Sequence, residues 1–168
     1  MTLDAHALVI GVSHYRHIGQ LPHGADAADL AGLLRDPVAC GYDPARVTLL
    51  QDAAATRAAI LDGLDHLAEH ADPAATVVLY FAGHGGRPAD RGDAYLLPCD
   101  GRGGSLDELE ATAISIELLA RKLAALRAQR LTIVLDCCHT AGLADPRDAR
   151  DTPWLTDFDA AALAPLAK

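Results

Sequence analysis

Hydrophobic residues along the chain form two kinds of pattern, and the two kinds alternate. Short, largely apolar runs predict buried strands, at residues 7–12, 47–50, 76–82, 94–97 and 131–135. Apolar positions three or four residues apart predict amphipathic helices, over 26–34, 56–70 and 116–126. Strands that alternate with helices indicate βαβ units and a mostly parallel sheet. We therefore expect the α/β class, with helices on both faces of the sheet in a three-layer α/β/α sandwich.

Between these segments, residues rich in Gly, Pro, Asp and Arg predict loops. The strand at 76–82 runs directly into GHGG (83–86), a loop then leads to residue 94, and another loop is expected at 101–107 (GRGGSLD). An alternative for 83–86 is an ordinary turn with a solvent-exposed histidine. No repeat, low-complexity stretch or linker interrupts the pattern, and the length suits one domain. Residues 1–168 are therefore expected to form a single domain.

The charge balance limits the classes of partner. The formal net charge is −9, from 23 acidic and 14 basic residues. Nucleic acids and anionic membranes attract clustered Lys and Arg, so neither is expected as the main partner. The first four residues contain no basic group, and the apolar runs are far shorter than the roughly 18 residues of a membrane span. We therefore expect a cytoplasmic protein without a membrane contact.

The four cysteines do not suggest a disulfide framework. Cys137 and Cys138 are adjacent and cannot easily pair with each other, while Cys40 and Cys99 are isolated. No CxxC motif is present, so a structural zinc site has little support. Cys40 and Cys99 are expected to be small buried hydrophobic residues.

Two of the most apolar strands end in residues that can do chemistry. The strand at 76–82 runs into His84, which lies between glycines, and the strand at 131–135 runs into Asp136, Cys137, Cys138 and His139. In open α/β sheets, functional groups gather at the carboxyl ends of the strands. If the two strands are near neighbours, a thiol and an imidazole face each other there, and such a thiol can ionise to a strong nucleophile.

Three segments then resemble the caspase superfamily, especially the metacaspases and the bacterial caspase-like peptidases. YFAGHG (80–85) is similar to the family's histidine motif and DCCHTAG (136–142) to its cysteine motif, while AYLLPCD (94–100) resembles the stretch between them. In caspases the histidine lies about 50 residues before the cysteine, and here Cys138 follows His84 by 54 positions. The resemblance covers about 7–142 and implies a caspase-like fold and a cysteine endopeptidase.

The resemblance also implies a role for each matching residue. Cys138 is the expected nucleophile, and His84 is the expected general acid and base. The backbone N–H groups of Gly85 and Cys138 are the expected oxyanion hole. Cys137 and His139 are not expected to act in catalysis, because Cys137 precedes the matching position and the side chain of His139 points away from that of its neighbour.

Substrate preference is expected to follow from two carboxylates. In metacaspases an Asp two positions before the nucleophile and another in the loop after the first strand bind a basic P1 side chain, and these positions match Asp136 and Asp26. We therefore expect cleavage after Arg or Lys. Asp26 has an alternative role as a carboxylate that caps a helix N-terminus. The family often has Ser where this chain has Ala82, which weakens the expected preference.

The resemblance further implies a second chain or chain segment. The sequence ends at Lys168, where the family passes from its large to its small subunit, so 143–168 is expected to be an inter-subunit linker or a processed tail. The resemblance implies a small-subunit chain, a protein or peptide substrate, and an activating partner in bacterial defence or cell-death signalling. No cofactor or metal is expected, because 113–119 (AISIELL) lacks the paired Asp residues of calcium-dependent relatives.

Two alternatives stay open beside the peptidase. One is a catalytically silent caspase-fold module that binds partners, although such modules usually lack one of the two catalytic residues. The other is a metal site formed by Cys137, Cys138 and His139, which has poor local geometry and lacks a fourth ligand.

Overall fold

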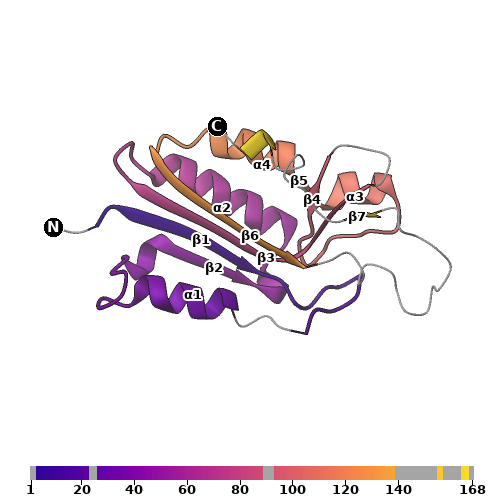
Figure 1. Ribbon diagram of the computed structural model, residues 1–168, viewed down its shortest axis with the longest axis horizontal. Helices are drawn as coiled ribbons and strands as arrows, with labels where there is room; N and C mark the ends of the chain where they lie inside the picture. The colour runs from indigo at the N-terminus through magenta and orange to yellow at the C-terminus, as the bar shows by residue number, and fades with distance from the viewer. Residues whose placement is uncertain (1–2, 23–25, 89–92, 139–154, 157–163, 167–168) are drawn as a thin grey trace.

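The computed structural model describes residues 3–22, 26–88, 93–138, 155–156 and 164–166 (Figure 1). For Cys138 the description covers the backbone position. Most of the expected 143–168 tail lies outside the described residues, so its role as a linker stays a prediction. No helix in the described ranges is long and apolar enough to cross a membrane.

A parallel sheet forms the centre of the molecule, as predicted. Its strands lie in the order β2 (Val47–Gln51), β1 (Ala5–Gly11), β3 (Thr76–Pro88) and β6 (Arg130–Cys138). All three neighbouring pairs are parallel. Every residue of β1 is buried, because this strand is covered on both faces. The alternation of strands and helices in the sequence therefore correctly predicted the α/β class.

The strand β3 is longer than the sequence predicted. The predicted strand ended at residue 82, whereas β3 continues through 83–86 as far as Pro88. In this extension β3 pairs with β4 (Tyr95–Leu96), which pairs with β5 (Ile114–Ser115), and both pairings are antiparallel. The last residues of β3 also pair with the short strand β7 (Leu155–Thr156). The glycines thus lie where β3 changes partners and other segments approach its backbone closely, rather than in a turn.

Helices cover the two faces of the sheet unequally (Figure 1). The helix α1 (Asp26–Arg35) packs on one face, while α2 (Arg57–His70) and α4 (Ile116–Ala124) pack on the other. Each of the two buried side-chain clusters lies between the sheet and one of these helix layers. Short 3₁₀ turns lie at η1 (Pro44–Arg46), η2 (Asp52–Ala54) and η4 (Ala164–Leu166).

The helix α3 (Leu106–Thr112) was missed by the sequence prediction, which placed a loop over 101–107. The side chain of Ser105 accepts a hydrogen bond from the Glu108 amide at 3.2 Å, which caps the first turn. Leu109 is fully buried and anchors the helix on the core. Ser followed by Glu three residues later is the sequence signature of such a cap. The glycines just before Ser105 led to the prediction of a loop instead.

The strand β6 is less covered than its neighbours. Val78, Tyr80 and Ala82 of β3 lie opposite Thr132, Val134 and Asp136 of β6 and share a face with them. On that face Tyr80 is buried in the α1 cluster, but Val134 is 41% exposed. The helix α1 therefore covers β1 to β3 and leaves this face of β6 open.

Candidate active site

The two expected catalytic residues lie opposite each other on neighbouring strands. In the β3–β6 register, His84 is paired with Cys138, and Ala82 is paired with Asp136. Neighbouring strands are about 4.8 Å apart, so the structure brings the backbones of His84 and Cys138 together at the carboxyl end of the parallel sheet. This is the position at which open α/β sheets carry their functional groups.

The imidazole of His84 is fully buried, with an exposure of 0%. Its Nε2 lies 2.9 Å from the carbonyl oxygen of Gly19. Because a carbonyl can only accept, Nε2 carries the proton and donates it, and Nδ1 of the neutral ring keeps a free lone pair. Nδ1 is buried and has no hydrogen-bond partner among the described residues. The arrangement therefore leaves Nδ1 ready to accept a proton.

Burial lowers the pKa of His84 below its ordinary value, and the hydrogen bond to Gly19 offsets only part of this shift. The imidazole is therefore neutral at neutral pH, which is the form that a general base needs. A buried ring of this kind also excludes the alternative that residues 83–86 are an ordinary turn with an exposed histidine.

Tyr15 contacts both the backbone and the ring of His84. Its hydroxyl oxygen accepts a hydrogen bond from the backbone N–H of His84 at 2.6 Å, and the two rings lie with their centroids 4.8 Å apart at 40°. Burial raises the pKa of Tyr15 well above its usual value, so the hydroxyl stays protonated. A Cβ atom on Gly83 would lie 2.7 Å from this hydroxyl oxygen. Gly83 is therefore required for the close approach of Tyr15.

The loop after β1 carries both Tyr15 and Gly19. At its base, the carboxylate of Asp52 accepts hydrogen bonds from the backbone N–H and hydroxyl of Ser13 and from the backbone N–H of His14, at 2.8–3.0 Å. The backbone N–H of Leu21 donates to the carbonyl of Ser13 at 2.9 Å, which closes the loop. Sequence analysis did not identify these residues, because only distant segments of the chain explain their contacts.

The two expected S1 carboxylates lie at the same edge of the sheet. Asp26 is the first residue of α1 and is exposed, and Asp136 is exposed on β6. Burial raises the pKa of Tyr80, and the negative charges of Asp136 and Asp26 raise it further. Both carboxylates therefore lie near one phenol, on the face of the sheet that α1 covers. Tyr80 was not identified from the sequence as part of this region.

The remaining expected positions are less informative. Gly85 is buried and is paired with Leu96 across β3 and β4. Cys137 is half-buried and packs against the core on the side of α2 and α4, which agrees with a structural role. His139 lies outside the described residues. No cluster of three or more potential metal ligands occurs in the part of the chain that the structure covers.

Comparisons with known proteins identify the fold of this chain. The family model for the caspase domain matches residues 4–161. The crystal structure of protein GSU0716 from Geobacter sulfurreducens superimposes with a TM-score of 0.62 at 23% sequence identity. The match covers 82% of this chain and 51% of that protein, so the chain spans about half of its length. No curated protein sequence matches this chain.

Proposed function

Because the chain belongs to the caspase domain family, we propose that it is the catalytic part of a cysteine endopeptidase in which Cys138 and His84 act together. The observation that carries the proposal is the juxtaposition of the two residues. His84 lies opposite Cys138 in the sheet, and its Nε2 is engaged by Gly19 while Nδ1 keeps its lone pair. A neutral, oriented imidazole next to a cysteine is the arrangement that activates a thiol.

In the proposed mechanism the thiol proton of Cys138 passes to Nδ1 of His84. The sulfur then forms a bond to the carbonyl carbon of the scissile peptide, and the backbone N–H groups of Gly85 and Cys138 stabilise the oxyanion. As the C–N bond breaks, the proton on Nδ1 moves to the leaving amine. A water molecule hydrolyses the thioester, which releases the new carboxyl group and restores the thiol.

The proposed substrates are proteins cleaved after Arg or Lys. Asp26 and Asp136 are both exposed, and both lie close enough to Tyr80 to influence its hydroxyl. Two carboxylates at the open edge of the sheet favour a guanidinium or ammonium group over an acidic side chain. In such a pocket, Tyr80 would form part of the wall beneath the P1 side chain.

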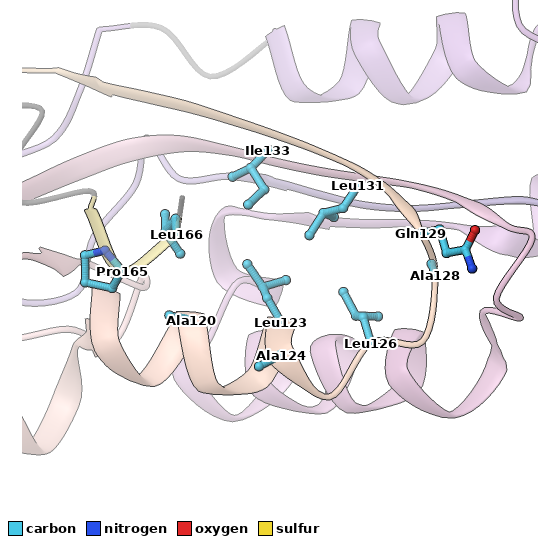
Figure 2. Close-up of a pocket in the computed structure, with 10 residues that line it drawn as sticks. All are labelled: Ala120, Leu123, Ala124, Leu126, Ala128, Gln129, Leu131, Ile133, Pro165 and Leu166. Atoms are coloured by element: carbon cyan, nitrogen blue, oxygen red, sulfur yellow. The ribbon is translucent and has the colours of Figure 1, made fainter. Parts of the chain in front are cut away.

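A second polypeptide or chain segment is proposed to complete the domain beside β6. No described strand pairs with the edge of β6 that faces away from β3. On the α4 side, a groove of about 330 Å³ that is lined mainly by Leu, Ile, Ala and Pro side chains lies between α4, β6 and η4. Figure 2 shows that Leu131 and Ile133 of β6 and Leu123 of α4 point into this groove. A small subunit that adds a strand to β6 would pair with this open edge.

The test is cleavage of fluorogenic peptides that end in Arg, Lys, Asp or Leu, by the chain with its small-subunit partner. We expect cleavage after Arg and Lys, which Cys138→Ala and His84→Ala abolish and Asp136→Asn reduces selectively. Cys137→Ala is the matched control and should retain activity. Activity that survives Cys138→Ala would refute the assigned nucleophile. If the protein with its partner cleaves none of the peptides, the catalytically silent binding module would be favoured.

A further inference from the structure

The loop at 13–21 contacts His84 at two separate points. The Tyr15 hydroxyl holds the backbone of His84 at 2.6 Å, and the Gly19 carbonyl holds the ring at Nε2 at 2.9 Å. The orientation of the imidazole therefore depends on the distance between residues 15 and 19 of the loop. An interaction that fixes this distance therefore also fixes the orientation of the His84 ring.

The side chain of Gln20 makes such an interaction. Its side-chain nitrogen donates to the carbonyl oxygen of Tyr15, and its side-chain oxygen accepts from the backbone N–H of Tyr15, both at 2.8 Å. One side chain thus occupies the backbone donor and the backbone acceptor of Tyr15. Gly19 is the adjacent residue, so this clamp sets its carbonyl relative to the tyrosine ring.

We propose that Tyr15 and Gln20 are positioning residues that hold His84 with its proton on Nε2 and its lone pair on Nδ1. The inference rests on the proposed function, because the Nδ1 lone pair is the group that would accept the thiol proton of Cys138. Neither residue touches the sulfur or a substrate in this scheme. They act through Gly19 and through the backbone of His84.

Other contacts hold the beginning of the loop independently of Gln20. Asp52 fixes the loop at Ser13 and His14, and the backbone N–H of Arg16 donates to the carbonyl of Cys99 at 2.9 Å. Within the span from 17 to 20, the side chain of Ile18 packs against the core, and the described hydrogen bonds are the pair made by Gln20 and the bond from Gly19 to His84. Loss of the Gln20 pair therefore leaves the Gly19 carbonyl positioned by its bond to His84 and by the packing of Ile18, with no hydrogen bond from its own loop among the described contacts.

The variants separate hydrogen bonding from packing. Gln20→Ala removes both bonds to Tyr15. Gln20→Glu keeps the size and one acceptor but loses the donor at neutral pH, so a role in filling space alone would survive it. Tyr15→Phe keeps the ring beside His84 and leaves the His84 N–H without its acceptor. Tyr42→Phe makes the same chemical change as Tyr15→Phe in the α1 cluster and serves as its matched control.

Two measurements test the proposal on the full chain. NMR of chain labelled with ¹⁵N in histidine reports which ring nitrogen carries the proton, and peptide cleavage with the partner present reports kcat and KM. In wild type we expect a single Nε2–H tautomer. In Gln20→Ala and Gln20→Glu we expect a mixture of tautomers and a His84 pKa still further below its ordinary value, because the hydrogen bond to Gly19 raises this pKa. We expect kcat to fall about tenfold, as the loss of a hydrogen bond or two implies, with KM nearly unchanged.

The outcomes are distinguishable from those of the proposed function. An unchanged tautomer and titration of His84 in the two Gln20 variants would overturn the positioning role, whatever the activity. A wild-type protein that cleaves no peptide would overturn the proposed function, and the NMR result would still decide whether the clamp sets the ring. Because Gln20 is exposed, its variants should fold even if Tyr15→Phe does not.

Discussion

Replacement of Gly83 by Ala tests the close packing under His84 directly. The added Cβ would lie 2.7 Å from the Tyr15 hydroxyl oxygen and 3.2 Å from two ring carbons of Phe81. An ordinary contact of this kind is about 3.4 Å or longer, so the hydroxyl must move by roughly 0.7 Å. The hydrogen bond from His84 to this oxygen, now 2.6 Å, would then reach or pass the limit of good geometry.

The expected cost combines two effects. Overpacking of a close-packed core costs about 1–3 kcal/mol, and the weakened bond adds about 1 kcal/mol. We therefore expect Gly83→Ala to lower the free energy of unfolding by about 2–4 kcal/mol, measured by urea denaturation. In the double variant Tyr15→Phe/Gly83→Ala the nearest clashing atom is gone, so the two effects should be less than additive by about 1 kcal/mol or more.

Gly32→Ala is the matched control, since no atom lies within 4 Å of a Cβ at this position in α1. It should be neutral or stabilising by up to about 1 kcal/mol, because alanine favours the helix over glycine. Either of two results would refute the reasoning: Gly83→Ala within about 0.5 kcal/mol of wild type, or full additivity with Tyr15→Phe.

Three further predictions concern pH, the loop and β6. Burial lowers the pKa of both His84 and His6, so the unfolded chain binds more protons as the pH falls through about 6.5, and the free energy of unfolding should decrease there. Urea denaturation at several pH values should show a flatter profile when both are replaced by Gln. Asp52→Ala removes three hydrogen bonds to the loop at 13–21 and should cost about 2 kcal/mol in the same assay, whereas no change would show that other contacts hold the loop. Val134 is 41% exposed on β6, so Val134→Lys should reduce self-association of the isolated chain in light scattering, and an unchanged mass distribution would contradict this.

The sequence was sufficient to predict the parallel core of this fold. Each strand is a compact apolar run, and each major helix has apolar residues at helical spacing, so local pattern and final burial agree. The predicted strand ended too early, at residue 82, because the glycines at 83–86 were not recognised as part of β3. Their purpose depends on Tyr15, which lies 68 positions before Gly83 and whose hydroxyl occupies the space of a side chain. No local pattern contains that information.

The sequence predicted the two expected catalytic residues of the candidate site but not the contacts that orient them. His84 and Cys138 follow apolar strands and carry recognisable motifs, so their meeting at one edge could be expected once the strands were neighbours. The contacts that orient His84 could not be expected. They come from Gly19 through its backbone carbonyl, which any residue possesses, and from Gln20 through a bond to its own loop. Such roles leave no signature in residue type.

This chain surrounds the His84 side of the proposed site more completely than the Cys138 side. The histidine half is buried and braced by the loop at 13–21, with its hydrogen bonds within the described residues. The β6 half carries the nucleophile and Asp136 on a strand that has a described neighbour on one edge and an exposed side chain at Val134. Under the proposed function, a partner that covers β6 would therefore act on the nucleophile and the substrate pocket and leave the general base unchanged. Regulation by such a partner should then alter the reactivity of Cys138 and the affinity for a basic P1 residue, while the tautomer of His84 stays the same.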